Sequence, residues 1–277
     1  MAATLSENSY GKQAVRLVRV HRGKKRHHLQ DVTVAIRCAG KFAAAYKDGD
    51  NREVLPTDTM KNTVYALAAE HPFDDVEEFG LLLTAHFLQA SRRAAKIQVD
   101  LAERLWKRID AHAFRRAGGE RRTAVVTGDR RGTQVRSGLA DLVVMKTTKS
   151  AFEGFPRDRY TTLKETADRL LATSVEASWS YSHPPEDFGK AWQGVRRLLL
   201  DTFAAHDSRS VQHTLYAMGE AVVETLDVEE IHIAMPNLHH LPVDLAPFGL
   251  ENRNEIFVAT AEPYGLIEGT VRRGSPS

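Results

Sequence analysis

The chain has 277 residues, enough for one large domain or two small ones, and its 42% hydrophobic and 27% charged residues exclude a disordered protein. Its 38 basic and 36 acidic side chains leave a net charge of +2, so the composition does not require a nucleic-acid or membrane partner. A single cysteine, Cys38, excludes an internal disulfide framework and a multi-cysteine metal cluster. Twelve histidines therefore hold most of the remaining titratable chemistry.

Alternating apolar residues predict a β-hairpin near the N-terminus. Strands over residues 15–20 and 32–38 would each bury one face, and the basic loop 21–28 would join them. Residues 57–63 are rich in hydroxyl side chains, which indicates a turn that opens a helix-like segment.

A longer helix is predicted next, with Pro72 near its start and Asp74 and Asp75 in its first turn, where carboxylates favour the helix dipole. Apolar residues recur at helical spacing and predict one buried stripe. The stripe consists of Val76, Phe79, Leu83, Phe87 and Ala90.

Two further strands are predicted over residues 97–105 and 122–126, separated by a turn at residues 117–120. The wider stretch 92–136 carries 13 basic and 5 acidic residues, a local net charge of +8. This excess suits either a phosphate-binding surface or a solvated strand face with basic loops. Aromatic residues in the stretch are few and not interleaved for base stacking, which favours the solvated face.

The second half of the chain repeats this plan. The predicted elements are strands over residues 142–146 and 175–181, a helical stripe at Phe188, Trp192, Val195, Leu199 and Phe203, a helix over 211–226 with Leu215, Met218 and Val222 inward, and a strand over 231–235. A final hairpin is predicted over residues 255–273, turning near Pro263-Tyr264-Gly265.

Each half therefore has two strands, a helical segment and two more strands. Residues 160–166 repeat the hydroxyl-rich pattern of 57–63, and residues 166–171 predict a helix-like segment. We expect an α+β protein with domains over residues 1–136 and 137–277, each an antiparallel sheet with helices layered on one face. Exposed sheet edges need cover, which favours an oligomer.

The common catalytic and cofactor motifs are missing from the sequence. It contains no phosphate-binding loop, no dinucleotide-binding glycine pattern, no zinc-protease helix and no nucleophile elbow. The pairs His27-His28 and His239-His240 make poor metal sites, because adjacent strand residues point to opposite faces. Taken alone, Arg169 is either a salt-bridged surface residue or a clamp for a flat oxyanion.

Five sequence motifs gain meaning when they are taken together. In chain order they are Tyr10-Gly11-Lys12, Thr57-Asp58-Thr59-Met60-Lys61-Asn62-Thr63-Val64-Tyr65, Phe152-Glu153-Gly154-Phe155-Pro156-Arg157-Asp158 running through Tyr160-Thr161-Thr162-Leu163-Lys164-Glu165-Thr166 to Asp168-Arg169, Ser210-Val211-Gln212, and Pro236-Asn237-Leu238-His239-His240. The set resembles the urate oxidase (uricase) family, in its bacterial type, over nearly the whole chain.

The resemblance implies tandem tunnelling-fold (T-fold) domains. Family members pair into barrels that stack as a homotetramer, with active sites at the subunit interfaces. The implied partners are urate, dioxygen and further copies of the chain, with no nucleic acid and no membrane. The N-terminus lacks the apolar core of a signal peptide, and Ser275-Pro276-Ser277 differs from a peroxisomal Ser-Lys-Leu ending, so we expect a cytoplasmic protein.

The resemblance also implies a set of residues that bind the substrate. They are Thr57, Asp58, Phe152, Leu163, Arg169, Val211, Gln212 and Asn237. Arg169 would clamp the purine through two parallel hydrogen bonds, Gln212 would bind its opposite part, and Phe152 would stack on its face. The backbone N–H groups of Asp58 and Val211 would add further contacts to the ring, and Leu163 would form an apolar wall.

Lys12, Thr57 and His239 resemble the catalytic triad of the family. A lysine amine linked through a threonine hydroxyl to water removes a proton from urate if its pKa is lowered from about 10.4, and a histidine relays that proton. Asn237 would hold dioxygen or water above the ring, with Thr57 coming from the neighbouring subunit. The implied reaction gives 5-hydroxyisourate and hydrogen peroxide with no cofactor and no metal, because the urate dianion supplies the electrons.

Two other classes of function are compatible with parts of this pattern. A catalytically silent purine-binding protein on the same scaffold would need only Arg169, Gln212 and Phe152. A zinc-dependent, pterin-type enzyme would need a convergent histidine cluster, which the sequence does not indicate. One departure from the family pattern is Glu153, which stands where many relatives have a different residue beside the stacking phenylalanine.

Overall fold

A computed structural model describes residues 3–274 and divides the chain into two compact units. The first unit contains Met1–Gly138 with Glu186–Gly189, and the second contains Leu139–Pro185 with Lys190–Ser277. Each unit consists of antiparallel strands and helices, so the predicted α+β class is confirmed. The ending Ser275-Pro276-Ser277 lies outside the described residues.

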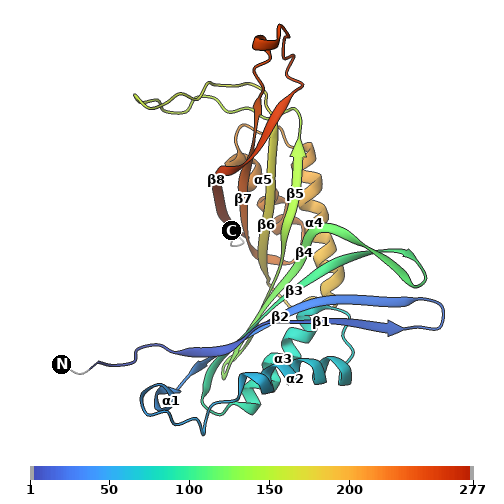
Figure 1. The fold of residues 1–277 in the computed structure, drawn as a ribbon, viewed down its shortest axis with the longest axis vertical. Coiled ribbons are helices and arrows are strands. Elements are labelled where there is room, and N and C mark those ends of the chain that lie inside the picture. Colours follow the sequence, from blue (N-terminus) through green and yellow to red (C-terminus); the bar gives the residue numbers. More distant parts are fainter. Residues whose placement is uncertain (1–2, 275–277) are drawn as a thin grey trace. The chain divides into compact units, whose positions relative to one another are not determined.

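The first unit is a sheet of sequential antiparallel strands with helices on one side (Figure 1). Its elements are β1 (Ser9–Arg22), β2 (His27–Gly40), α1 (Ala43–Lys47), α2 (Thr57–Glu70), α3 (Val76–Ala90), β3 (Ala94–Asp110), β4 (Ala113–Asp129) and the start of β5 (Gly132–Lys146). Helix α3 packs on β3 and β4, whereas α2 packs on β1. The predicted N-terminal hairpin is confirmed as β1 and β2.

One face of this sheet forms the core of the first unit. The fully buried apolar side chains of β2 are Val32, Val34, Ile36 and Cys38, which alternate with more exposed residues. They meet the buried stripe of α3, which is Val76, Phe79, Leu83 and Phe87. Ala90, the last predicted member of that stripe, is exposed because the helix ends there. Asp75 is the N-cap of α3 in a capping box with Glu78, so it precedes the first turn in which we expected it.

The predicted turn at residues 117–120 is wrong. Strand β4 continues through this region, and the chain reverses between Asp110 and Ala113 instead. The register of β3 against β4 shifts opposite the Gly118-Gly119 pair, and Gly118 has φ of +119°. The two glycines therefore form a bulge inside a long strand. Glycine suits a bulge as well as it suits a turn.

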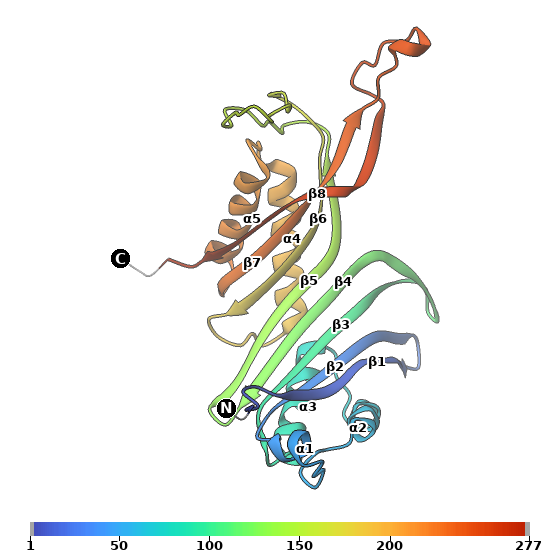
Figure 2. The same cartoon turned by 60° about the vertical axis from the view of Figure 1, so that its left-hand side comes forward.

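The second unit has its helices on one side of a sheet formed by β6, β7 and β8 (Figure 2). Its elements are the end of β5, then β6 (Leu171–Tyr181), α4 (Phe188–Ala205), α5 (Val211–Thr225), β7 (Val228–Pro242), the 3-10 turn η1 (Ala246–Phe248) and β8 (Phe257–Arg272). Helix α5 packs on β7 and β8. The predicted apolar positions of α4, α5 and β7 are all buried, which confirms those three elements.

Two predictions for the second half are wrong. Residues 166–171 form no helix, because Thr166 uses its N–H and its C=O in a two-stranded bridge with Phe152, and β6 starts at Leu171. The predicted final hairpin is one continuous strand, β8, and the reversal lies between β7 and β8 around η1. The Pro263-Tyr264-Gly265 segment sits where the register of β7 and β8 shifts, so it is an irregularity within a strand.

Within residues 3–274, no helix is long and apolar enough to cross a membrane. The same part of the chain contains no group of three or more His, Cys, Asp or Glu side chains placed to hold a metal ion.

Candidate active site

The sequence-predicted site residues fall into two groups, one in each unit. The first unit holds Lys12, Thr57 and Asp58. The second unit holds Phe152, Leu163, Arg169, Val211, Gln212, Asn237 and His239.

A bulge in β1 determines which way Lys12 points. Lys12 pairs with Ile36 and Val15 pairs with Val34, so β1 has one residue more than β2 between these two pairs. Ile36 and Val34 both face the core. Because side chains alternate along a regular strand, Lys12 and Val15, which are three positions apart, would point to opposite faces if the strand had no bulge. The bulge, where Ala14 has φ of +57°, puts the lysine on the face covered by α2.

Thr57 and Asp58 are the first two residues of α2. Pro56 is the N-cap and gives no side-chain cap, so the backbone N–H groups of the first turn have no partner within the helix. Such a helix start attracts anions. The Asp58 carboxylate accepts hydrogen bonds from Lys61 and Asn62, and these contacts, with the nearby charge of Lys12, lower its pKa.

In the second unit, Phe152 and Arg169 lie on two antiparallel segments that bring them together. The backbone N–H and C=O of Phe152 both pair with Thr166, at 2.8 and 3.1 Å, and the N–H of Arg169 bonds the Ser150 carbonyl at 2.8 Å. The guanidinium carbon of Arg169 then lies 5.3 Å from the centroid of the Phe152 ring. Phe155 stacks on the same ring, with centroids 4.9 Å apart.

Asp168 holds this pair of segments in place, although its role was not foreseen from the sequence. Its carboxylate accepts a hydrogen bond from the Thr148 hydroxyl at 2.6 Å and another from the Ser150 N–H at 3.2 Å. These donors lower the pKa of Asp168, so the carboxylate is ionised over the whole neutral range. The Asp-Arg dipeptide in the motif is the only sequence sign of this arrangement.

The Arg169 side chain is prepared for an acceptor that the described part of the chain does not provide. Its Nε atom is buried and has no hydrogen-bond partner among the described residues. Burial also lowers the pKa of the guanidinium, which nevertheless remains a cation at neutral pH. A buried N–H without a partner costs free energy, and a flat acceptor beside the Phe152 ring would recover it.

In the second unit, the N-terminus of helix α5 is another helix start among the candidate residues. Ser210 is its N-cap, and its hydroxyl accepts the N–H of His213. The N–H groups of Val211 and Gln212 stay without intrahelical partners. The Gln212 side chain is exposed, whereas the Val211 side chain is buried, so only the backbone of Val211 is available for contacts.

Asn237 and His239 lie in β7, at the register shift between β7 and β8. Asn237 pairs with Thr173 of β6, and the Thr173 hydroxyl is buried without a partner among the described residues. His240 bonds the Leu238 carbonyl through Nδ1 at 3.0 Å. Register shifts of this kind are frequent beside active sites because they re-aim side chains.

Comparison with known proteins decides the family. The Uricase family model matches residues 8–127 and 135–268, and both groups of candidate residues lie within these ranges. A curated uricase of Arthrobacter globiformis is 46% identical over 97% of this chain and 90% of its own length. The chain belongs to the uricase family.

Other members of the uricase family agree with this placement. A uricase of Dictyostelium discoideum is 40% identical over 98% of both chains. The crystal structure of the Arthrobacter globiformis uricase superposes with a TM-score of 0.95, covering 100% of this chain and 98% of that one. A urate oxidase structure from Bacillus sp. TB-90 has a TM-score of 0.85 at 24% identity, which shows a shared fold. The predicted family and the T-fold architecture are thereby confirmed.

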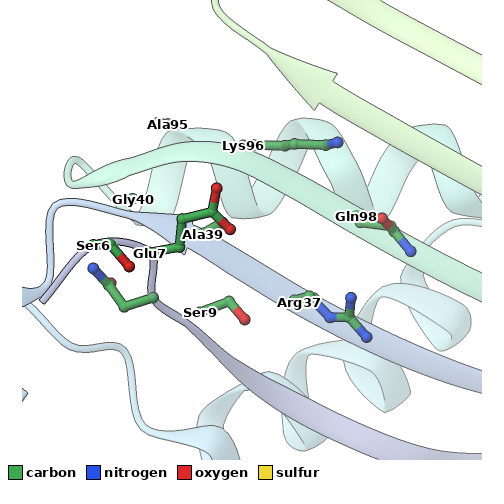
Figure 3. Close-up of a pocket in the computed structure, with 10 residues that line it drawn as sticks. Ser6, Glu7, Ser9, Arg37, Ala39, Gly40, Ala95, Lys96 and Gln98 are labelled. Atoms are coloured by element: carbon green, nitrogen blue, oxygen red, sulfur yellow. The ribbon is translucent and has the colours of Figure 1, made fainter.

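A groove of about 630 Å³ opens on the first unit of this uricase-family chain, and its lining residues include none of the candidate residues (Figure 3). It is lined by Ser6, Glu7, Asn8, Ser9, Arg37, Ala39, Gly40, Ala95, Lys96 and Gln98. Arg37 and Ala39 alternate with the buried Ile36 and Cys38, so this groove lies on the sheet face opposite the helices. The helix-covered face and this groove are thus separate features.

Proposed function

We propose that this chain is a urate oxidase that needs no cofactor and converts urate, dioxygen and water into 5-hydroxyisourate and hydrogen peroxide. Membership of the uricase family supports the activity. The observation that carries the proposal is Arg169, whose buried Nε lacks an acceptor among the described residues and whose guanidinium carbon lies 5.3 Å from the centroid of the Phe152 ring. An aromatic plane beside a desolvated planar cation fits a flat, anionic purine.

The second unit would hold the purine from several sides. Arg169 would form two parallel hydrogen bonds to a carbonyl and a ring nitrogen, and the amide of Gln212 would offer one donor and one acceptor to the opposite part. Phe152 would stack on the ring, and Leu163 would form an apolar wall. The free N–H groups at the starts of α2 and α5 favour negative charge, which a urate anion supplies.

Proton transfer is assigned to Lys12, Thr57 and His239. The Lys12 amine, connected to the Thr57 hydroxyl and water, would take a proton from the urate monoanion, and His239 would relay it. Asn237 would hold dioxygen, and later water, above the ring. The dianion then gives its electrons to dioxygen and water adds at C5, so the protein supplies orientation and proton movement.

We further propose a homotetramer with active sites between subunits. Gln212 and Leu163 are exposed in the single chain, and the Leu163 side chain is 53% exposed. A pocket for this reaction must exclude bulk water, which exposed walls do not achieve. We propose that Lys12, Thr57 and Asp58 of one subunit cover the purine-binding group of its neighbour. T-fold domains over residues 1–136 and 137–277 and a cytoplasmic location also remain proposals.

Aerobic incubation of the purified protein with urate tests the activity. We expect loss of the ultraviolet absorbance of urate with one hydrogen peroxide released per urate consumed, unchanged after treatment with a chelator. Urate binding without turnover would favour a silent purine-binding protein. Turnover that disappears on chelation and returns with zinc would favour the zinc-dependent alternative, for which the described residues provide no ligand cluster.

A further inference from the structure

We propose that Tyr10 is a positioning residue, which holds Thr57 at the correct place for proton transfer through a hydrogen bond to the backbone just before α2. This inference rests on the proposed function, because it concerns the geometry of Thr57 relative to Lys12. Tyr10 itself touches neither substrate nor reacting atoms.

The central contact joins β1 to the segment that leads into α2. The Tyr10 hydroxyl accepts a hydrogen bond from the N–H of Leu55 at 2.9 Å, across 45 positions of sequence. Only Pro56 lies between Leu55 and Thr57. Pro56 is the N-cap of the helix with φ of −56° and ψ of 136°, and its ring restricts φ. A shift of the Leu55 backbone is therefore transmitted to Thr57 with little flexibility in between.

The Tyr10 ring is itself fixed by packing. It makes an edge-to-face contact with Phe42, with ring centroids 4.9 Å apart and planes at 89°. Its strand partner is the fully buried Cys38, and the ring packs against the core of the first unit. Burial raises the pKa of the Tyr10 hydroxyl, so the group stays neutral and keeps its place as an acceptor for the Leu55 N–H.

The same short segment of β1 also carries Lys12. Tyr10 and Lys12 pair with Cys38 and Ile36, which share the core face, so both side chains point to the helix side of the sheet. Gly11 between them lies so close to β2 that a Cβ atom there would be 1.8 Å from the Ile36 carbonyl oxygen. This contact fixes the backbone on both sides of the glycine. Tyr10 thus ties Thr57 to the strand segment that positions the lysine.

The test compares Tyr10→Phe with a matched control, Tyr46→Phe. Tyr46 lies in α1 and donates a hydrogen bond to the carbonyl of Ser9, also at 2.9 Å, so this control removes a second hydroxyl that anchors the same end of β1. It leaves the Leu55 contact intact. We measure kcat and KM for urate, the melting temperature, and amide hydrogen exchange of the peptide containing Leu55.

For Tyr10→Phe we expect faster exchange at Leu55, a fall in kcat of about 2- to 10-fold from one lost hydrogen bond, and an unchanged KM. Tyr46→Phe should keep kcat and the exchange rate at Leu55. In a Thr57→Ala background, Tyr10→Phe should cause no further loss of kcat, because its effect passes through Thr57.

Three results would overturn the role of Tyr10. They are faster exchange at Leu55 with unchanged kcat, unchanged exchange and unchanged kcat together, and an equal fall in kcat for both phenylalanine variants. A full additional loss in the Thr57→Ala background would also exclude an action through Thr57. A wild-type protein without urate turnover would contradict the proposed function itself. If the wild-type protein turns over urate normally, the results with the variants test only the role of Tyr10.

Discussion

Arg169 and Phe152 lie together because their two short segments pair as antiparallel strands, which leaves the guanidinium carbon 5.3 Å from the ring centroid. The cation and the aromatic plane are thus both in place before any ligand arrives. Preorganisation of this kind lowers the entropy that binding would otherwise cost. The pair is therefore the natural place to begin testing substrate binding.

Replacing Arg169 with alanine should mainly weaken urate binding. Loss of hydrogen bonds from a charged donor costs about 1.5–3 kcal/mol, so KM should rise about 10- to 150-fold with a smaller change in kcat. Steady-state kinetics measures both constants. Arg159→Ala is the matched control, since the exposed Arg159 lies 4.6 Å from the centroid of the Tyr160 ring and should leave KM unchanged. Equal effects of the two substitutions would contradict the clamp.

Lys12→Ala and Thr57→Ala should mainly lower kcat. A positioned proton acceptor contributes roughly 10²- to 10⁴-fold to rate, and neither side chain is proposed to hold the purine ring as firmly as Arg169. KM should change only modestly. Lys25→Ala, which removes an exposed lysine of the β1–β2 turn, serves as the control. A large rise in KM with normal kcat would show that the lysine binds urate instead of moving protons.

Glu103 provides a prediction about stability and pH. It pairs across the sheet with Arg122, whose guanidinium is shared by Asp75 and Glu77 at 2.7 and 2.5 Å. Burial raises the pKa of Glu103 to about 7, against the opposing charge of Arg122 and with further increases from the nearby carboxylates. An acid with a raised pKa in the folded state stabilises the fold below its unfolded pKa, and that contribution is lost as the pH rises through about 7.

Glu103→Gln should therefore gain stability over wild type as the pH rises. Between pH values of about 5.5 and 8.5, the difference in unfolding free energy should shift by about 2 kcal/mol in favour of the variant. Urea unfolding at the two pH values measures this shift. Glu70→Gln, at the exposed end of α2, should give a difference that does not depend on pH. A Glu103→Gln difference equally independent of pH would contradict the raised pKa.

Substitution by alanine should change the stability of the protein in opposite directions at two glycines. Gly11→Ala would place a methyl group 1.8 Å from the Ile36 carbonyl oxygen, so β1 must shift, at a cost of roughly 2 kcal/mol or more. Gly194 lies in α4, where a Cβ would meet Leu226 at 3.5 Å, an ordinary contact. Gly194→Ala should stabilise the protein by about 0.5–1 kcal/mol. Melting temperatures of both variants decide, and a stable Gly11→Ala would contradict the close approach.

The fold could be predicted wherever apolar periodicity and chain length agreed. The stripes of α3 and α4 and the alternation in β2 and β7 correspond directly to buried faces, because burial is what selects those residues. The predictions of secondary structure failed where the same residue types are compatible with two different local structures. Gly118-Gly119 suits a bulge as well as a turn, and the Thr166 segment is committed to a partner strand that only the tertiary structure reveals.

The prediction of the candidate site rests on its sequence motifs and not on the physics of any one residue. Arg169 on its own is more typical of a surface or salt-bridged residue, and its buried Nε, without a partner among the described residues, is visible only in the structure. The positioning contacts of Asp168 and Tyr10 involve backbone groups of distant residues. Such contacts leave no pattern in side-chain types, so the sequence contains the residues without indicating their partners.

The direction of Lys12 depends on the bulge in β1. Deleting Ala14 would allow a regular ladder between β1 and β2. Lys12 and Val15 would then be two positions apart in β1, as their partners Ile36 and Val34 are in β2. The sheet would then still form around Val15 and the lysine would still face the helices, whereas a regular ladder that kept Ala14 would turn the lysine towards the face without helices. Loss of the bulge with every residue kept would thus separate folding from catalysis, with no change to any catalytic side chain.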